Sequence, residues 1–479
     1  MSDISRKDFL KNSALASSLA FVPGLDTASR RGWLEKLNHL QGEAKNIIFM
    51  VSDGMSSGTF ALADLVNRRQ FGSECHWVSL YNNRDRAYHR GLMDMASLDS
   101  PVTDSAAASS SWGGGKRIQN GAINMLPDGR RLKPICQIFR DAGKKTGLVT
   151  TTRMTHATPA GFAVNVPDRN MEDEIALQYL KHEYDLLMGG GSRHFDPDER
   201  EDGKDLWAGF RAKGYQVVRK KSELTGNDDR KLLGIFSESH LPYTIDRRNS
   251  SALNATVPTI AEMTETALKR LDGSSVGFLL QVEGGRVDHG AHGNDAAALI
   301  YDQIEFDEAV SVALDFIADR DDTLLIITTD HGNANPGLSG AGERYSESAA
   351  RLDHIQHFTR SNDWILSELD EHSSITNIRN RVEAATAIGI TKQEASMIKQ
   401  SLEGSLQTVY RAKSDSDAVL GSVLANYLSI NWLSTSHTAD YVELAALGPG
   451  IEQMDAFTRN TELFDMMVKM AGVREYAAG

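Results

Sequence analysis

Short apolar runs alternate with amphipathic helical stretches along most of this 479-residue chain. The runs are almost continuously apolar, which is typical of strands in a parallel sheet that helices cover on both faces. The alternation therefore predicts an α/β fold around a central, mostly parallel sheet. The predicted strands are Asn46–Ser52, Thr146–Thr152, Tyr184–Met188, Val276–Val282, Thr323–Thr329 and Tyr441–Leu447.

One helix is especially clear in the stretch that precedes the Thr323–Thr329 strand. Apolar residues recur there at helical spacing, and acidic residues fill many of the positions between them. We therefore predict an amphipathic helix with one face in the core. Its apolar positions are Ile300, Ile304, Val310, Leu314 and Ile317.

Residues 337–436 differ from the rest of the chain. They begin with Gly-Leu-Ser-Gly-Ala-Gly and continue as polar helical patterns, with Ile375–Ala385 and Lys392–Leu402 as predicted helices. Because this stretch separates two pieces of the strand and helix pattern, we interpret it as a subdomain inserted into a core of residues 45–336 and 437–475. A second irregular region, roughly Gly190 to Thr256, is rich in Asp, Arg and Lys and is predicted to elaborate another loop.

The chain is acidic, because 51 Lys and Arg residues against 65 Asp and Glu residues give a net charge of −14. Nucleic acid is therefore not expected as a partner, since binding it requires clustered basic side chains. A phosphate substrate remains compatible, because a few bound metal ions reverse the charge of one site. The two cysteines, Cys75 and Cys136, either pair in an oxidising compartment or are buried free thiols.

The first 30 residues resemble an export signal of the twin-arginine type. Ser5-Arg6-Lys7-Asp8-Phe9-Leu10-Lys11 precedes a weakly apolar stretch from Ala14 to Leu25, with Lys7 in place of the second arginine. The alternative is a basic amphipathic first helix. Neither this stretch nor any other reaches the ~20 apolar residues of a membrane span. We therefore expect an exported protein, periplasmic or secreted, without a membrane span.

Carboxylates and imidazoles cluster where three predicted strands end. In an open α/β sheet, ligands bind at the carboxyl ends of the strands. A single Asp after a strand is more simply a turn former or a helix N-cap. A carboxylate beside an imidazole, however, is a preferred pair of zinc ligands, so the whole set favours a metal site. The set consists of Asp53, then Glu283, Asp288, His289 and His292, and then Asp330 and His331.

Ser105 lies at the predicted start of an Ala-rich helix, directly after Asp104. A helix N-terminus offers free backbone N–H groups to an anionic phosphate. A serine hydroxyl there becomes a strong nucleophile when a metal favours its alkoxide. Without the metal ligands, simple N-capping by Asp104 or Ser105 would be the better interpretation.

Together these segments resemble the alkaline phosphatase family, whose motifs occur here in the same order from about Lys45 to about Gly450. The resemblance implies a three-layer α/β/α sandwich with a crown-like inserted subdomain. It also implies hydrolysis of small phosphate monoesters to an alcohol and inorganic phosphate through a phosphoserine. The motifs are Val51–Met55, Thr103–Ala107, Thr155–Ala160, Glu283–His292, Thr329–His331 and Ser436–Thr438.

The resemblance further implies two zinc ions and a third metal, usually magnesium. The first zinc would stabilise the leaving oxygen, and the second would activate Ser105. Members of the family are often homodimers, so a homodimer is one option for this chain. The implied ligands are Asp288, His292 and His437 for the first zinc; Asp330 and His331, with Asp53 as a bridge, for the second; and Asp53, Thr158 and Glu283 for the third metal.

Three further positions gain a role only through the resemblance. Arg169 matches an arginine that would grip the phosphate oxygens with two hydrogen bonds. His156 and His289 stand where some bacterial relatives have Asp and Lys, and each would act through a water, His156 near the third metal and His289 near the phosphate. The imidazole of His156 leaves the identity of the third metal open, because magnesium prefers oxygen ligands.

Two alternatives to a monoesterase remain at this point. One is a phosphodiesterase, phosphonate hydrolase or sulfatase on the same two-zinc scaffold. Neither cysteine lies in the Cys-x-Pro-x-Arg pattern of sulfatases, and two-metal diesterases generally lack the pair Thr158 and Glu283. The other is a non-catalytic zinc- or phosphate-binding protein, against which the intact Ser105 argues.

Overall fold

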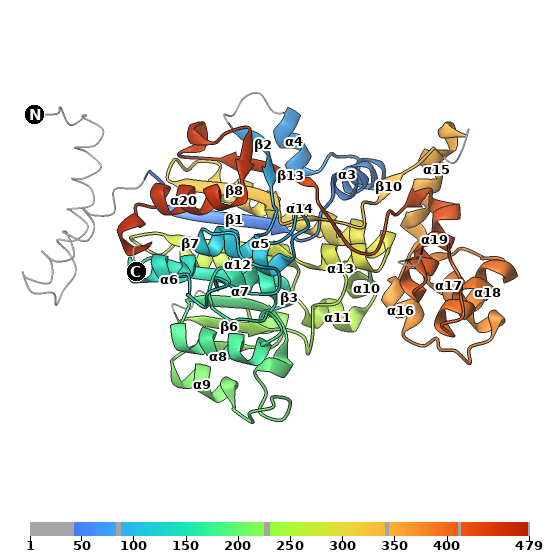
Figure 1. The fold of residues 1–479 in the computed structure, drawn as a ribbon, viewed down its shortest axis with the longest axis horizontal. Helices are drawn as coiled ribbons and strands as arrows, with labels where there is room; N and C mark the ends of the chain where they lie inside the picture. Colours follow the sequence, from blue (N-terminus) through green and yellow to red (C-terminus); the bar gives the residue numbers. More distant parts are fainter. Residues whose placement is uncertain (1–42, 83–87, 225–229, 341–343, 411–412, 478–479) are drawn as a thin grey trace, which may run out of the picture.

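A ten-stranded sheet forms the centre of the molecule (Figure 1). The computed structural model describes residues 43–82, 88–224, 230–340, 344–410 and 413–477, so the predicted export signal lies outside the described residues. Along the sheet the order is β14-β2-β13-β8-β1-β7-β3-β4-β6-β5. The strands are β1 Asn46–Ser52, β2 His89–Asp94, β3 Lys145–Arg153, β4 Leu186–Gly190, β5 Gln216–Val218, β6 Leu232–Ile235, β7 Phe278–Gly284, β8 Thr323–Thr329, β13 Tyr441–Leu447 and β14 Phe457–Arg459.

All six predicted strands are present in this sheet. The ranges of β1, β8 and β13 agree with the prediction residue for residue, whereas β4 begins two residues later than expected. β7 runs on to Gly284, so Glu283 is the penultimate residue of its strand and does not follow it. β1, β3, β4, β5, β6, β7 and β8 pair in parallel, and β13 is antiparallel to both of its neighbours. The sheet is therefore mostly parallel, as predicted.

Helices cover both faces of the sheet, because alternate residues of the central strands are buried on opposite sides. In β1, Ile48 and Met50 belong to one hydrophobic cluster and Ile47 and Phe49 to the other. This confirms the three-layer α/β/α sandwich. One layer contains α3 Ser57–Phe71, α4 His76–Asn82, α12 Ile260–Leu271 and α14 Ala296–Ile317, and the other contains α5 Ser105–Gly114, α6 Ile135–Asp141, α8 Glu172–His182, α9 Leu206–Ala212 and α20 Asn460–Met470.

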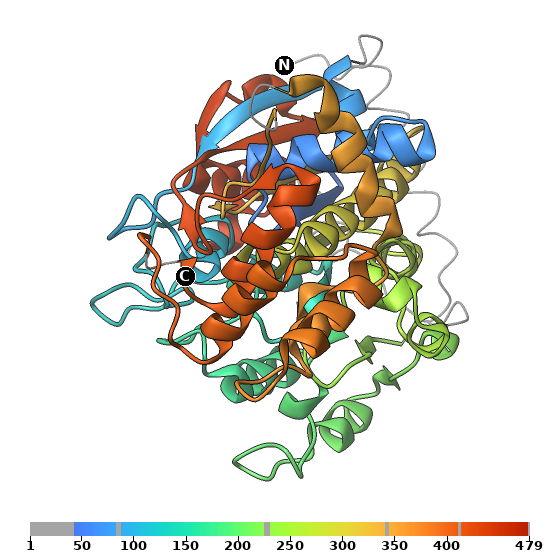
Figure 2. The ribbon, with the colours of Figure 1, turned by 90° about the vertical axis from the view of Figure 1, so that its right-hand side faces the viewer.

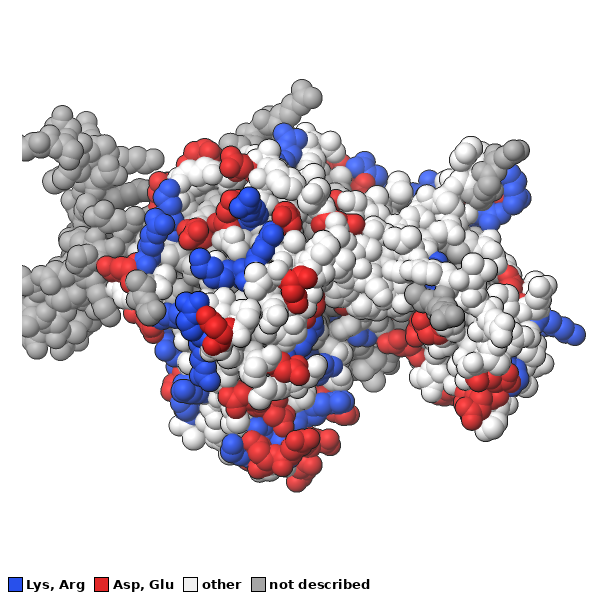
Figure 3. All heavy atoms as spheres, in the orientation of Figure 1, with Lys and Arg blue, Asp and Glu red and all other residues white. Residues whose placement is uncertain are grey.

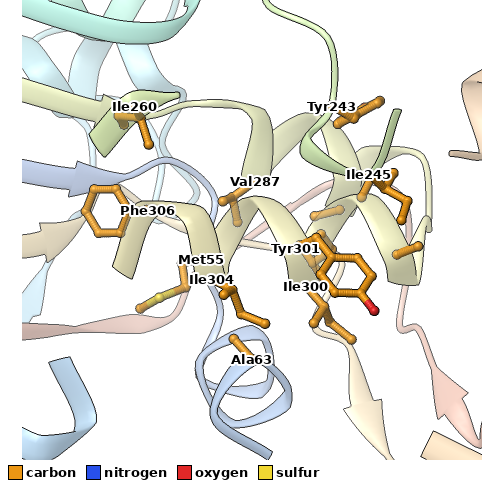
Figure 4. Close-up of a cluster of buried hydrophobic side chains, with 14 of the residues drawn as sticks. Met55, Ala63, Tyr243, Ile245, Ile260, Val287, Ile300, Tyr301, Ile304 and Phe306 are labelled. Atoms are coloured by element: carbon orange, nitrogen blue, oxygen red, sulfur yellow. The ribbon is translucent and has the colours of Figure 1, made fainter. Parts of the chain in front are cut away.

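The long helix α14 is the clear helix of the sequence. Its side chains Ile300 and Ile304 point toward α3, where Ala63 lies (Figure 4). The N-cap Asp295 accepts hydrogen bonds from the backbone N–H groups of Ala297 and Ala298. α14 thus anchors the segment immediately before it, which carries several of the predicted site residues.

The structure of the region 190–256 differs in one respect from the prediction. It was expected to elaborate a loop, but β5 and β6 within it extend the central sheet at one edge. The reason is that these strands have only three and four residues, too few to show a periodic pattern. The described part of the region also contains short helices, including α10 Thr244–Arg248 and α11 Ser251–Thr256.

The described residues of the stretch 337–436 lie outside the central sheet. The start and the end of this stretch meet as a separate antiparallel pair, β10 Gly337–Leu338 with β11 Ile430–Asn431. The predicted helices are present as α17 Ile375–Thr386 and α18 Lys392–Leu402. Figure 2 shows these helices, in orange, in front of the core. Buried residues of this stretch belong to the same hydrophobic cluster as α14. The other helices are α15 Ser348–Asp353, α16 Asn362–Leu366 and α19 Ser416–Leu428.

Cys75 and Cys136 are both buried and free, which agrees with the thiol alternative. Among the described residues, none of the helices is both long enough and apolar enough to cross a bilayer. Basic and acidic side chains are intermixed on the face shown in Figure 3.

Lys144 is a buried cation at the opposite end of the sheet from the predicted site. Its ammonium group donates hydrogen bonds to the carbonyl oxygens of Lys45 and Val276, and so joins the starts of β1 and β7. Burial, reinforced by the nearby charge of Lys45, lowers the pKa of Lys144 to about 8.

We expect this shift in pKa to make the free energy of unfolding change with pH in the alkaline range. Between about 8 and 10.5 the unfolded chain binds the proton more tightly than the folded protein, so the free energy of unfolding rises with pH by up to about 1.4 kcal/mol per unit. Urea unfolding of the wild type and Lys144→Met at several pH values measures this. The wild type should gain stability relative to the variant from pH 8 to 10, and a constant difference would contradict the prediction.

Candidate active site

The predicted carboxylates meet at one edge of the sheet because their strands are neighbours in register. Ser52 at the end of β1 pairs with Thr329 of β8 on one side and with Gly284 of β7 on the other. Asp53, Glu283 and Asp330 therefore lie side by side, and all are fully buried. The prediction is confirmed for Asp53 and Asp330, which follow their strands, whereas Glu283 lies within β7 and still reaches the same edge of the sheet.

A first group of ligand atoms comes from α13, which spans Arg286–His292, and from the short strand β12, His437–Thr438. The His292 Nε2 atom lies 3.3 Å from Asp288 Oδ2 and 3.0 Å from His437 Nε2. The His437 Nε2 atom lies 3.6 Å from Asp288 Oδ1. β12 pairs with β9, Gly332–Asn333, and this pairing brings a residue from beyond the inserted stretch to the edge of β8.

Hydrogen bonds fix the tautomers of both histidines. The Nδ1 atom of His292 donates to the Thr435 carbonyl oxygen at 2.7 Å, and that of His437 donates to the Thr103 carbonyl oxygen at 2.9 Å. Each neutral ring therefore presents an Nε2 lone pair, and the two lone pairs face each other and the Asp288 carboxylate. Three electron-rich atoms in this arrangement require a cation or a proton between them. In the metal-free protein, burial is outweighed by the Asp288 carboxylate, which raises the pKa of His292 to about 9.

A second group adjoins the first and contains Asp53, Asp330 and His331, whose ligand atoms lie within 4.8 Å of one another. The His331 Nε2 atom is 3.2 Å from Asp330 Oδ2 and 3.6 Å from Asp53 Oδ1. The His331 ring stacks on the His437 ring at a centroid distance of 3.7 Å. The two groups are thus in direct contact.

Ser105 is the first residue of α5, as the sequence indicated, and its Oγ atom lies 3.3 Å from His331 Nε2. The preceding Asp104 caps the helix, because its carboxylate accepts the Ala107 N–H at 2.8 Å. Capping by Asp104 leaves the Ser105 hydroxyl available beside the second group. The N-cap interpretation therefore applies to Asp104 and not to Ser105.

Arg169 reaches the same place from a loop after α7, which spans Ala157–Gly161. One terminal nitrogen of its guanidinium donates to Asp104 Oδ2 at 3.1 Å, and the other lies 3.1 Å from His156 Nε2. The sequence alone gave no reason to choose this arginine among the others. The structure brings it next to the residue that precedes Ser105.

A third group lies on the other side of Asp53 and contains Asp53, His156 and Glu283. The Thr158 hydroxyl donates to Asp53 Oδ2 at 3.3 Å, so Thr158 joins the group. The His156 Nδ1 atom is 3.8 Å from Glu283 Oε1. The His156 Nδ1 atom therefore lies near the carboxylates, but it carries the ring proton in this structure, because the Arg169 guanidinium can only donate to Nε2.

Several buried polar atoms of these groups have no hydrogen-bond partner among the described residues. An unpaired buried polar atom is costly, so the pattern suits bound cations. Burial, together with the charges of neighbouring carboxylates, raises the pKa of Asp53 well above its usual range, and burial raises the pKa of Asp330 to about 8. The unpaired atoms are Asp53 Oδ1, Asp330 Oδ2, His331 Nδ1, Glu283 Oε1 and His156 Nδ1.

Gly54 permits the close approach of the α13 segment to β1. Its φ is +68°, and a Cβ atom there would lie 2.4 Å from Asp288 Oδ1 and 2.8 Å from the Asp288 Cα atom. Only glycine fits this position without moving a predicted metal ligand. The Gly54 N–H also donates to Asp330 Oδ1 at 2.9 Å, so the same residue holds a ligand of the second group.

The family model for alkaline phosphatase matches residues 44–473 of the chain. The chain belongs to the alkaline phosphatase family. It is therefore an enzyme of the phosphoric monoester hydrolase class, and the family resemblance seen in the motifs is confirmed.

Individual alkaline phosphatases agree over nearly the whole chain. The crystal structure of the Thermus thermophilus enzyme is 36% identical, covers 94% of this chain and 96% of its own, and has a TM-score of 0.85. The structure of a cold-active alkaline phosphatase from a psychrophilic Shewanella is 25% identical, covers 89% and 99%, and has a TM-score of 0.71. Alkaline phosphatase 4 of Bacillus subtilis is 27% identical over 441 residues, 90% of this chain and 89% of the relative.

In this member of the alkaline phosphatase family, His240 is a site residue that the sequence analysis missed. Its ring lies 4.2 Å from that of His289 and 5.7 Å from that of His156, measured between centroids. His289 itself accepts a hydrogen bond from the Arg286 guanidinium at 2.9 Å. His240 follows β6, so recognising that short strand would have placed the histidine at the same sheet edge.

Proposed function

We propose that this enzyme hydrolyses phosphate monoesters through a phosphoserine at Ser105, in a site that holds two zinc ions and a third metal. The observation that carries the proposal is the convergence of the His292 and His437 Nε2 lone pairs on the Asp288 carboxylate. Backbone carbonyl partners on the other ring nitrogen are the usual feature of metal-binding histidines. The family provides the substrate class, small phosphate monoesters.

The donor atoms of each group fit the metals that the family implies. Imidazole nitrogens with carboxylate oxygens suit zinc in the first two groups. When bound, the metal ions supply Lewis-acid chemistry, since they neutralise charge on oxygen atoms and favour a deprotonated hydroxyl. The proposed ligands are Asp288, His292 and His437 for the first zinc; Asp53, Asp330 and His331 for the second; and Asp53, Thr158 and Glu283, with His156 beside them, for the third metal.

The residues of the chain supply the nucleophile and the grip on the substrate. The Ser105 hydroxyl gives up its proton to solvent as Oγ attacks phosphorus, the ester P–O bond breaks, and the leaving alkoxide takes a proton from water. A water molecule then loses a proton to solvent as it attacks the phosphoserine, the Oγ–P bond breaks, Ser105 Oγ takes up a proton, and inorganic phosphate leaves. The free N–H groups at the start of α5 and the two terminal nitrogens of Arg169 face the phosphate oxygens in both displacements.

His156 determines the identity of the third metal in this proposal. Its Nδ1 atom lies beside Glu283, so an imidazole stands where an oxygen ligand would suit magnesium, which disfavours magnesium relative to zinc. We expect His156→Asp to raise the magnesium-to-zinc ratio at the third site by roughly tenfold or more, measured by metal analysis after dialysis against both ions. An unchanged ratio would show that His156 does not face the third metal.

A diesterase, phosphonate hydrolase or sulfatase on the same scaffold is the main alternative. Arg169, Thr158 and Glu283 argue for monoesters through the family resemblance, and Arg169 lies beside Asp104, the residue before Ser105. A non-catalytic zinc- or phosphate-binding role does not explain a serine hydroxyl at a helix N-terminus beside His331.

Metal analysis combined with a substrate comparison tests the proposal. The purified protein should contain two zinc ions and one further metal ion per chain. It should also hydrolyse a chromogenic phosphate monoester much faster than the corresponding diester. A protein that binds no zinc, or that prefers the diester, would overturn the proposal.

We also propose that the protein is periplasmic or secreted, on the strength of the basic and apolar residues 5–25. Division into a core of residues 45–336 and 437–475 and an inserted subdomain 337–436 remains part of the same proposal, as does a homodimer. Expression with and without residues 1–30, followed by cell fractionation, tests the export signal.

A further inference from the structure

We propose that Asn294 is a positioning residue that holds the ligands of the first zinc in register and connects them to the inserted stretch. The inference deepens the proposed function and rests on it. Asn294 follows α13 and precedes the start of α14. It contacts both chain segments that contain the proposed ligands of the first zinc, although it is not itself a ligand.

Asn294 joins the two segments through its side-chain amide. The Nδ2 atom donates to the carbonyl oxygen of Ala291, within α13, at 3.2 Å and to that of Ser434 at 2.8 Å. Ala291 directly precedes His292, and Ser434 lies three residues before His437. One side-chain amide therefore connects α13, which contains Asp288 and His292, with the segment that contains His437.

The backbone of Asn294 is held as tightly as its side chain. The residue is 1% exposed and has a φ of +43°, a left-handed conformation that Asn tolerates better than most residues. This conformation turns the chain sharply between α13 and α14. A neighbouring hydrogen bond, from His292 Nδ1 to the Thr435 carbonyl oxygen, also joins α13 to the segment that contains His437. It therefore requires these two segments to keep the same relative position.

The inserted stretch packs directly on this turn at two points. Gly421 of α19 lies so close that an added Cβ atom would be 2.6 Å from both the Cβ and the carbonyl oxygen of Asn294. Asn362 at the start of α16 donates from Nδ2 to the Gly293 carbonyl oxygen at 3.2 Å, and its backbone N–H donates to Asp295. Any displacement of α16 or α19 therefore moves the turn that holds the first zinc's ligands.

The first test changes the amide of Asn294. In Asn294→Asp the donor becomes a carboxylate oxygen that faces two carbonyl oxygens, so we expect the first zinc to bind roughly tenfold or more weakly. The measurement is zinc affinity by competition with a chromogenic chelator, and the site is identified by comparison with His437→Ala. If Asn294→Asp does not fold without metal, Asn294→Gly, which keeps the left-handed backbone, takes its place.

Asn124 provides a closely matched control. It is also buried, has a φ of +49°, and its Nδ2 atom donates to the carbonyl oxygens of Gly161 and Val164. Neither segment carries a proposed ligand of the first zinc. Asn124→Asp should therefore lower the melting temperature of the metal-free protein while leaving the affinity for the first zinc unchanged.

The second test approaches Asn294 from the inserted stretch. Gly421→Ala raises the intrinsic helix propensity of α19, yet its methyl group must displace Asn294. We expect Gly421→Ala, like Asn294→Asp, to lower the affinity for the first zinc. Gly389→Ala, at a position of the inserted stretch where an added Cβ would meet nothing within 4 Å, is its control.

The outcomes separate this inference from the proposed function. A wild-type protein that retains no zinc would overturn the proposed function. A wild type that retains zinc, with Asn294→Asp and Gly421→Ala binding it as tightly as Asn124→Asp and Gly389→Ala, would overturn the inference alone. Selective weakening in both test variants supports it.

Discussion

Ser105→Ala is expected to lower kcat by roughly a thousandfold or more while the protein keeps its metal ions. The substitution removes the atom that attacks phosphorus, and loss of a catalytic nucleophile has effects of this size or greater. It removes no proposed ligand. The N-cap of α5 also stays intact, because Asp104 and not Ser105 caps the helix. Steady-state hydrolysis of a chromogenic monoester, together with metal analysis, measures both quantities.

Ser111→Ala is the matched control for this prediction. Ser111 lies in the same helix, is fully buried, and uses its hydroxyl only for a hydrogen bond to the Ala108 carbonyl oxygen in the described structure. Its substitution should leave the rate close to that of the wild type. Incorporation of phosphate at low pH should also label the wild type and Ser111→Ala but not Ser105→Ala. Wild-type activity in Ser105→Ala would refute the serine mechanism.

Asp53→Asn is expected to act in opposite directions with and without metal. Asp53 belongs to two of the three groups of ligand atoms, so its loss should remove the second and third metals and lower activity by at least about a hundredfold. In the metal-free protein, by contrast, Asp53 is a buried carboxylate whose pKa is raised by burial and by the neighbouring carboxylates. An amide of the same shape removes that unfavourable charge.

The metal-free variant should therefore melt at a higher temperature than the metal-free wild type, while the metal-loaded variant melts at a lower one. Asp302→Asn is a suitable control, because Asp302 is also buried with a pKa raised by burial, to about 8, and lies in none of the three groups. Its effect on the melting temperature should be similar with and without metal. Destabilisation of the metal-free form of Asp53→Asn would contradict the prediction and would show that the fold itself requires the Asp53 carboxylate.

The fold was predictable from the sequence where strands are long and buried on both faces. β1, β8 and β13 each have seven residues, and apolar runs of that length can be recognised in the sequence as single strands. β5, β6, β2 and β14 were not predicted. They are short or lie near an edge of the sheet, where one side of a strand contacts solvent and the apolar pattern is broken.

The site residues likewise fall into those that the sequence pattern predicts and those that it does not. Asp53, Asp330 and Glu283 follow from the rule that ligands gather where parallel strands end. Asp288 and His292 follow from spacing within one run. His437 and Arg169 do not, because their places depend on β12 pairing with β9 and on a loop contact with Asp104. Only the family motifs singled them out, and nothing in the sequence indicated Asn294 or His240.

The position of β1 in the sheet has a consequence for how the enzyme matures. β1 is the first described strand in the chain, yet Ile47 pairs with Leu279 on one side and Leu324 on the other. Its partners are thus made late in synthesis, and long-range pairings of this kind form slowly. His437 is supplied later still. The proposed metal centre therefore lacks His437 until nearly the whole chain has been made, so we expect metal capture among the last events of biogenesis.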